Sequence, residues 1–243
     1  MTWNILHGGG PRRTPLIALE LVEQQPDILL LTEFRVAKGS QLRAVLADHG
    51  LTHQQTSHPG PRQNGLLLAS RWPIDSVNVP PPTSCAPRIL EADTAGLRIL
   101  GLHIPEKRGD SKRLHAWAHT INRARALADR PAVLLGDFNT GRNGSDGPRH
   151  AFDCTQRLGQ LATLGYIDAW RTQNPHGVGA TWHGELDRRE GWTKGRRIDH
   201  AWLSAPVSQR LRAVHHDAST VAQGLSDHTS LVVELARTDA EVA

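Results

Sequence analysis

The stretch Leu134-Leu135-Gly136-Asp137-Phe138-Asn139-Thr140 decides the fold of this chain. Residues 132–135 are β-formers and predict a buried strand, which ends at a glycine, a carboxylate and an amide. Side chains alternate along a strand, so Asp137 and Asn139 are expected on the same side, at the edge where α/β proteins bind ligands. Their oxygens suit a hard cation or a phosphate rather than zinc. An Asx-turn explains the same residues equally well, so other segments must decide between the two.

A second apolar strand also ends in an acidic residue. Residues 26–33 read Pro-Asp-Ile-Leu-Leu-Leu-Thr-Glu and predict a buried strand with Glu33 at its carboxyl end. Before it, Thr14 as N-cap and Pro15 at the first helical position predict a helix to about residue 25. The first strand is expected over residues 2–6, with Asn4 near its end. The chain begins directly at this strand, which is compatible with further residues ahead of it in a longer polypeptide.

The middle of the chain is expected to alternate between strands and helices. Strands are expected over residues 51–56, 65–70, 89–94 and 97–103, and helices over residues 40–48, 111–128 and 152–164, with a polar surface loop up to residue 177. His103 ends one of these strands; it is either structural or part of the same ligand-binding edge. Lys107, Arg108, Lys112 and Arg113, at the start of the long helix, are expected to be mostly solvated, although a basic helix start also suits phosphate.

The last third adds a second carboxylate inside an apolar strand. Asp199 lies within the strand predicted over residues 197–204, and a buried carboxylate requires a hydrogen-bond partner or a cation. Asp227 and His228 precede a strand predicted over residues 231–235. We expect His228 to pair with Asp199. Residues 180–183, which include Trp182, are expected to form a short strand.

Composition narrows the choice of function. The 243 residues carry a net charge of +4, with a pI near 9.6, which favours polyanionic partners such as nucleic acid. No apolar run reaches membrane-spanning length and no leader precedes the first strand, so neither a membrane association nor export is expected. Only Cys85 and Cys154 are present, too few for a disulfide scaffold, and a reducing cytoplasm is expected.

Seven short motifs, taken in chain order, match one family. They are Trp3-Asn4-Ile5, Thr32-Glu33, Asn64-Gly65 with Ser70-Arg71-Trp72-Pro73, Leu102-His103, Gly136-Asp137-Phe138-Asn139, Arg197-Ile198-Asp199-His200 and Ser226-Asp227-His228. From residue 2 to about residue 235 the chain resembles the endonuclease/exonuclease/phosphatase superfamily, which includes deoxyribonuclease I and exonuclease III-type abasic-site endonucleases. The resemblance implies one domain over residues 1–243, built as a four-layer α/β-sandwich: two mixed β-sheets packed face to face, with helices outside.

The resemblance also implies hydrolysis of a phosphoester that depends on Mg²⁺ or Mn²⁺. By motif, Glu33 resembles the main metal-binding carboxylate, assisted by Asn4 and Asp227. Asp137 and Asn139 resemble the pair that orients the attacking water and holds the phosphate or a second metal. The remaining catalytic positions resemble an essential histidine, a carboxylate that orients it and a histidine on the scissile phosphate, here His228, Asp199 and His103.

The substrate expected from these motifs is DNA, cleaved by a monomeric enzyme. Asn64, Arg71 and Trp182 are candidate substrate-binding residues, although a turn, a solvated cation and core packing explain them as well. Abasic-site endonucleases have an acid where this chain has Leu6 and a tyrosine where it has His103. Hydrolysis of a small-molecule or lipid-head-group phosphoester is the alternative. A binding module that has lost its chemistry is disfavoured, because the acidic and histidine residues are all present.

Overall fold

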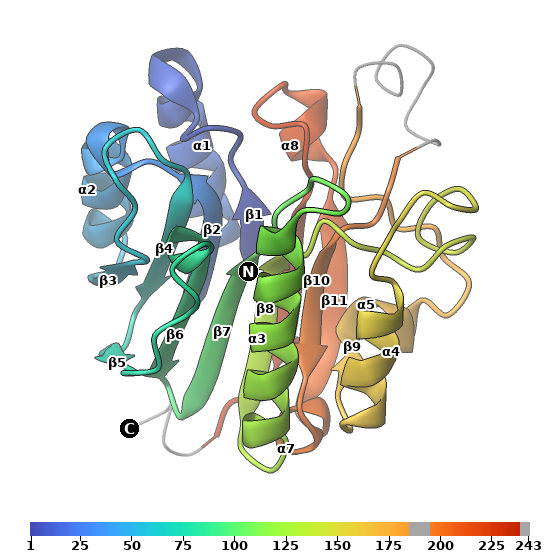
Figure 1. Cartoon of the computed structure of the whole chain (residues 1–243). Helices are drawn as coiled ribbons and strands as arrows, with labels where there is room; N and C mark the ends of the chain where they lie inside the picture. The colour runs from blue at the N-terminus through green and yellow to red at the C-terminus, as the bar shows by residue number, and fades with distance from the viewer. Residues whose placement is uncertain (185–194, 239–243) are drawn as a thin grey trace.

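Two β-sheets packed face to face form the centre of the molecule (Figure 1). The computed structural model describes residues 1–184 and 195–238, and within them each sheet has six strands. The first sheet has the order β11 (Leu211–Asp217), β12 (Ser230–Leu235), β1 (Thr2–Asn4), β2 (Ile28–Phe34), β4 (Gly65–Ser70), β3 (His53–Thr56). The second has the order β5 (Asp75–Ser76), β6 (Ile89–Thr94), β7 (Leu97–His103), β8 (Ala132–Asp137), β10 (Asp199–Leu203), β9 (Ile167–Asp168).

Helices cover the outer face of each sheet. The first sheet is covered by α1 (Gly10–Gln24) and α2 (Ser40–Asp48), the second by α3 (Ser111–Leu127) and α4 (Gln156–Thr163). Short helices complete the described chain: α5 (Ala169–Gln173), α7 (Ala205–Ser208), α8 (Ser219–Ala222), η1 (Val36–Lys38) and η2 (Ala86–Arg88). The predicted four-layer α/β-sandwich with helices outside is confirmed. Within the described residues, no helix has the length and apolar character needed to span a bilayer.

Strand β8 shows why the apolar runs in this sequence are continuous. Leu134 packs toward α3 and α4, whereas Val133 and Leu135 pack between the two sheets. Both faces of the strand are therefore buried, and apolar residues are required at successive positions rather than at alternate ones. The same holds for β2, where Leu29 and Leu31 face the helices and Leu30 faces the other sheet.

Several predicted elements have different boundaries in the structure. The strands predicted over residues 65–70, 89–94 and 97–103 and the helix over residues 40–48 are confirmed. Helix α1 begins at Gly10, so Thr14 is no N-cap; its hydroxyl donates to the Gly10 carbonyl one turn earlier. Helix α4 begins at Gln156, because the Phe152 amide is bonded to the side chain of Asn143. The loop predicted to continue to residue 177 contains α5.

Strand pairing gathers the polar strand ends at one end of the sandwich. Strands β1 and β2 are parallel and pair Asn4 with Thr32, next to Glu33. Strands β7 and β8 are parallel and pair His103 with Asp137, and β10 runs antiparallel to β8. Across the two sheets, the Asn4 side-chain amide donates to Asp137 at 3.1 Å. The carboxyl ends of strands from both sheets therefore meet.

A buried ion cluster fixes the segment that leads into β10. The Arg197 side chain is fully buried, and its guanidinium donates to Asp146 at 2.8 Å and to Asp168 at 2.6 Å and 3.0 Å. Both carboxylates are themselves buried. His200, whose Nδ1 lies 3.8 Å from Asp168 Oδ2, and the charge of Arg197 together hold the pKa of Asp168 far below its usual range despite its burial. Arg197, two residues before Asp199, thus pairs with two buried carboxylates, one of which it shares with Arg171.

Arg197→Met is expected to lower the free energy of unfolding by about 3 to 5 kcal/mol, because it removes the guanidinium that pairs with Asp168 and leaves Arg171 as the remaining counter-charge of Asp146. Urea unfolding at pH 7 measures the change. Arg212→Met, at an exposed position of β11, is the matched control and should change the stability by less than about 0.5 kcal/mol. Equal stabilities of the two variants would contradict a structural role for the cluster.

Candidate active site

A cleft of about 860 Å³ lies at the end of the sandwich where the polar strand ends meet. The structure places nine of the eleven predicted site residues in its lining: Asn4, Glu33, Asn64, His103, Asp137, Asn139, Trp182, Asp227 and His228. Asp199 lies behind His228 and reaches the cleft through it. Arg71 is the one predicted site residue that lies away from the cleft.

Asp137 and Asn139 form an Asx-turn and also line the cleft. Asp137 is buried; its Oδ1 accepts a hydrogen bond from the Asn139 amide at 2.8 Å, and its Oδ2 accepts one from Asn4. Asn139 has a left-handed backbone with φ 45° and donates its side-chain amide to the Ile104 carbonyl. The two interpretations of this stretch are therefore compatible, since the turn is what holds the carboxylate at the cleft wall.

Glu33 reaches the cleft through a β-bulge. The register between β2 and β4 shifts between Thr32 and Phe34, and Glu33 has φ 59°. Leu31 and Phe34 pack on the same face of the sheet although they are three residues apart, which strict alternation does not allow. The bulge thus releases Glu33 from the helix-covered face and directs it to the cleft. A strained backbone of this kind is typical of functional positions.

The Glu33 carboxylate is held by the first loop of the chain. Its Oε2 accepts a hydrogen bond from the His7 amide at 2.7 Å, and the His7 ring lies at the same distance. His7 in turn lies 3.0 Å from the side-chain amide of Asn64, whose oxygen accepts from Arg35 at 2.7 Å. Asn64 therefore positions the His7 loop and Arg35. His7 was not predicted, since a histidine beside three glycines has the appearance of an ordinary loop residue.

His228 and Asp199 form a buried pair. His228 Nδ1 lies 2.8 Å from Asp199 Oδ2, and both side chains are almost fully buried. Burial lowers the pKa of His228, but Asp199, with Asp137 and Asp227 nearby, outweighs this and raises the pKa to about 10. His228 is thus an imidazolium at neutral pH. Its ring faces the cleft because the bond to Asp199 fixes Nδ1 on the far side.

His103 lies between the carboxylates of Glu33 and Asp137. Its Nε2 is 3.7 Å from Asp137 Oδ2 and 4.0 Å from Glu33 Oε1. Arg88, at the end of η2, places one guanidinium nitrogen 3.0 Å and 3.2 Å from the two ring nitrogens. Burial, followed by the Arg88 charge, holds the pKa of His103 well below its usual value, so this histidine is neutral. Arg88 was not predicted, because nothing in the local sequence distinguishes it from other surface arginines.

Glu91, in β6, is a buried carboxylate that is not among the residues lining the cleft. It forms ion pairs with Arg98 at 2.7 Å and with Arg123 at 2.8 Å, and its side chain is buried between β6, β7 and α3. The ion pairs with Arg98 and Arg123 therefore account for the burial of Glu91, which has a structural role.

Trp182 lies at the cleft wall with one edge bonded to Asp227. Its indole nitrogen donates to Asp227 Oδ2 at 3.2 Å, and the Arg196 guanidinium lies 5.4 Å from the ring centroid. The predicted short strand over residues 180–183 is reduced to isolated bridges from Trp182 to Arg196 and to His228. Trp182 is only partly buried, so it is not simply a core residue.

The prediction that Arg71 binds substrate in this cleft was wrong. Arg71 lies at the opposite end of the sandwich, because β4 runs antiparallel to β2 and pairs Ser70 with Ile28, at the start of β2. There Arg71 forms an ion pair with Asp27 at 3.1 Å, so it does not bind substrate in this cleft. The basic residues at the start of α3 are mostly solvated, as expected, since Lys107, Arg108 and Lys112 are exposed. Arg113 differs from them, because it is buried, pairs with Asp153 and donates to the carbonyls of residues 105 and 139.

The side chains in the cleft fit a hard divalent cation. Glu33, Asp137 and Asp227 supply carboxylate oxygens, and Asp227 Oδ1 is buried without a hydrogen-bond partner among the described residues. Ligand atoms of Asp137, Asp199 and His228 also lie within 4.8 Å of one another. Asp199 Oδ2 is bonded to His228, whereas Asp199 Oδ1 is buried without a hydrogen-bond partner among the described residues. The carboxylates of Glu33, Asp137 and Asp227, which line the cleft, would hold the cation.

Metal-free protein is expected to lose stability as the pH rises from about 4 to 7. Burial and the nearby Asp199 raise the pKa of Asp137 to about 7. Within this range the folded chain keeps a proton that the unfolded chain has lost, so a rise in pH favours unfolding. Urea unfolding in EDTA at pH 5 and 7.5 should show wild type losing about 1 to 3 kcal/mol more than Asp137→Asn. Parallel pH curves for the two proteins would contradict the raised pKa.

The sandwich and its acidic cleft define the class of this protein as a hydrolytic phosphoesterase, and comparisons with known proteins agree. The chain belongs to the Endonuclease/Exonuclease/phosphatase family, whose model matches residues 1–228. Enzymes of this family hydrolyse phosphoesters and depend on divalent metals. No curated protein sequence matches the chain.

Solved structures with the same fold cover almost the whole chain. The 3′-5′ exonuclease NExo from Neisseria meningitidis is 25% identical, with a TM-score of 0.82 over 97% of this chain and 98% of that one. A 3′ phosphatase form of NExo bound to a product DNA hairpin is 24% identical, with a TM-score of 0.82 over 96% and 97%. An AP endonuclease from Archaeoglobus fulgidus is 21% identical, with a TM-score of 0.81 over 96% and 97%.

Proposed function

We propose that this protein is a Mg²⁺- or Mn²⁺-dependent phosphodiesterase that cleaves DNA. The observation that carries the proposal is the convergence of Glu33, Asp137 and the Asp199–His228 pair in one cleft, with His103 between the carboxylates. Hydrolysis of a phosphodiester requires an oriented water molecule and stabilisation of the charge that grows on the phosphoryl oxygens. These residues supply both.

Each side chain has a role that follows from its surroundings. A divalent cation held by Glu33, with Asn4 and Asp227, would polarise the phosphate and neutralise its charge. Asp137, fixed by two hydrogen bonds, orients the water molecule and accepts its proton; a pKa near the working pH suits a general base.

The two histidines act on the phosphate in different ways. His228 is a cation and donates from Nε2 to a phosphoryl oxygen, while Asp199 holds the ring in place. Neutral His103 donates a hydrogen bond to a second oxygen, beside the charge of Arg88. Asn139 supports this arrangement by fixing the Asp137 carboxylate through its backbone amide.

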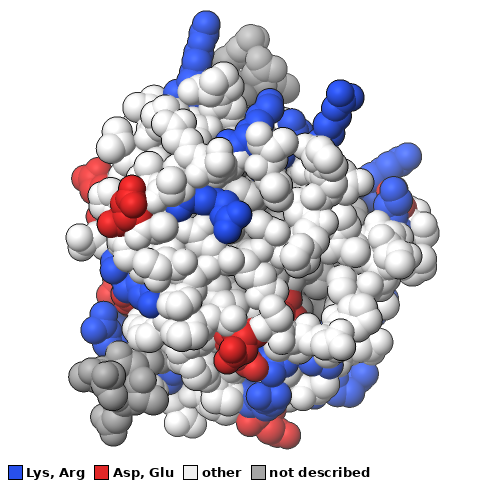
Figure 2. All heavy atoms as spheres, turned by 90° about the vertical axis from the view of Figure 1, so that its left-hand side faces the viewer, with Lys and Arg blue, Asp and Glu red and all other residues white. Residues whose placement is uncertain are grey.

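Charge around the cleft supports a polyanionic substrate. Arg88, Lys107, Arg108 and Arg196 line the cleft beside the acidic centre. On the face turned to the viewer in Figure 2, basic and acidic side chains are interspersed, and several Lys and Arg side chains protrude at its upper edge. Basic residues on both sides of a catalytic centre can hold the phosphates that flank the one being cleaved. The names of the similar structures, which include an exonuclease and an AP endonuclease, agree with a DNA substrate.

Purified protein should cleave plasmid, single-stranded or abasic oligonucleotides in Mg²⁺ or Mn²⁺, and EDTA should abolish the activity. Raising NaCl from 50 to 200 mM should lower kcat/KM by a factor of about 10 or more, because phosphate contacts release counterions. Cleavage of none of these DNAs, together with salt-insensitive turnover of a small phosphomonoester, would refute the DNA substrate and favour the small-molecule alternative.

A further inference from the structure

The central strand of the first sheet is shorter than both of its neighbours. Within the described residues, β1 has three residues, whereas β12 has six and β2 has seven. Strand β12 pairs with β1 only where Leu231 lies opposite Thr2. The space between β12 and β2 is therefore occupied by a strand only at the end of the sheet that is nearest the cleft.

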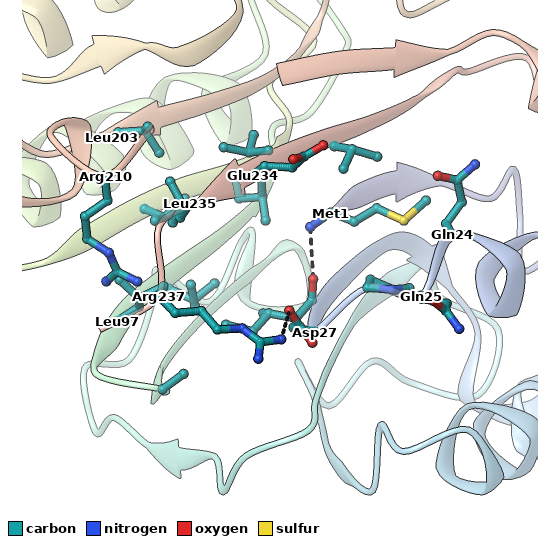
Figure 3. Close-up of a pocket in the computed structure, with 18 of the residues that line it drawn as sticks. Met1, Gln24, Gln25, Asp27, Leu97, Leu203, Arg210, Glu234, Leu235 and Arg237 are labelled. Atoms are coloured by element: carbon teal, nitrogen blue, oxygen red, sulfur yellow. Dashed lines mark hydrogen bonds and ion pairs between the residues drawn. The ribbon is translucent and has the colours of Figure 1, made fainter. Parts of the chain in front are cut away.

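A cavity of about 440 Å³ occupies the other end of the space between β12 and β2 (Figure 3). Leu97, Val133 and Leu203, from the inner face of the second sheet, form one side of it, and Gln24 and Gln25, at the end of α1, form another. A continuous sheet would separate these two groups, because they lie on its opposite faces. The cavity is thus a gap in the sheet itself.

We propose that this gap is a slot for an extended polypeptide segment that continues β1 ahead of Met1. The hydrogen bonds between β1 and β2 already continue as far as Met1, at the edge of the gap. The Met1 nitrogen donates to the Ile28 carbonyl at 2.9 Å, and the Leu30 amide donates to the Met1 carbonyl at 3.0 Å. These are the bonds of a residue within a parallel strand pair, so the backbone direction at Met1 leads straight into the slot.

The observed register defines the neighbours of each position in the slot. Thr2 lies opposite Leu231 in β12 and beside Leu30 in β2. Counting back from Thr2, the position directly ahead of Met1 falls between Val233 and Ile28. The next position falls between Glu234 and Asp27, and the third is opposite Leu235.

These neighbours define the chemistry of the segment. Val233, Ile28 and Leu235 pack toward the core between the sheets, so the first and third positions require apolar side chains. The second position lies on the outer face between two carboxylates, so it favours a basic side chain. At present Arg237 lies 3.5 Å from Asp27 and supplies a positive charge at this place (Figure 3).

Covalent continuity with Met1 is favoured over a separate peptide. The Met1 ammonium is buried, and this burial lowers its pKa to about 6 even though Asp27 lies nearby. A peptide bond at this nitrogen would keep the bond to Ile28 and remove a charge that is costly to bury. A segment joined to Met1 also avoids the entropic cost of association.

The test is an N-terminal extension of three residues, Leu-Lys-Val, placed directly ahead of Met1 and started with an additional methionine. It should raise Tm by about 5 to 10 °C, since it buries two apolar side chains and completes the ladder. The matched control is Lys-Leu-Lys, which has the same length but directs lysines into the core and should give no increase. Hydrogen exchange over residues 232–235 should slow at least about tenfold only with Leu-Lys-Val.

Each other outcome would overturn the proposal. Equal Tm values for the two extensions would show that the slot does not prefer apolar side chains at the first and third positions. An increase in Tm without slower exchange in β12 would place the segment elsewhere. Stabilisation of the unextended protein by the free peptide acetyl-Leu-Lys-Val-amide, without any gain from the fused extension, would assign the slot to a separate partner.

Discussion

Asp137→Asn is expected to reduce kcat on DNA by a factor of about 10³ while leaving the fold intact. The asparagine has the same shape and can still accept the hydrogen bond from the Asn139 amide that closes the turn. It cannot accept a proton from water, and it removes one negative charge from the wall facing His103 and Asn4. The substitution therefore separates the chemistry of this residue from its structural role.

Single-turnover cleavage of a labelled oligonucleotide in saturating Mg²⁺ measures the effect, with near-UV circular dichroism as the check on the fold. Asp75→Asn, an exposed carboxylate in β5 at a distance from the cleft, is the matched control and should keep full activity. A residual rate within tenfold of wild type would show that Asp137 is neither base nor orienting group.

His228→Ala is expected to lower kcat by a similar factor, about 10³, because it removes the charged hydrogen-bond donor that we propose for a phosphoryl oxygen. Asp199→Asn should cost less, about 10- to 100-fold, since the imidazole remains but loses the charge that keeps it protonated. That variant should also show a new loss of activity as the pH rises through about 7, where the unpaired histidine releases its proton. Wild type should not lose activity from this group until near pH 10.

A pH series from 5.5 to 9.5 on wild type, His228→Ala and Asp199→Asn distinguishes the two effects. His215→Ala, at an exposed histidine on the outer side of β11, is the control for loss of an imidazole and should behave as wild type. Identical pH profiles for Asp199→Asn and wild type would refute the assignment of His228 as a cation maintained by Asp199.

The fold was largely predictable from local pattern. Continuous apolar runs predicted buried strands such as β4, β7 and β8, and 3.6-residue periodicity predicted α2 and α3. Less regular segments were misplaced. Thr14 looked like a helix cap but lies one turn inside α1, since the helix already begins at Gly10 and has a proline at one of its first positions.

The candidate site was predictable only in part. Polar residues at strand ends identified Asn4, Glu33, His103 and Asp137, because such positions interrupt an apolar pattern. Arg88 and His7 interrupt no pattern, and both were missed although they contact His103 and Glu33. Arg71 follows a strand just as Glu33 does, but its strand runs in the opposite direction.

The opening stretch, residues 134–140, shows where the two sources of information divide. The sequence alone determined that a buried strand ends there with a carboxylate and an amide, because burial and alternation are properties of neighbouring residues. Only the tertiary structure decided what Asp137 faces. The Asn4 side-chain amide donates to it from the other sheet, and Asp199 lies opposite it in β10. Asp199 in turn is hydrogen-bonded to His228, which belongs to a different segment of the chain. Strand direction, the bulge at Glu33 and the packing of the two sheets depend on contacts between distant segments, which local periodicity does not encode.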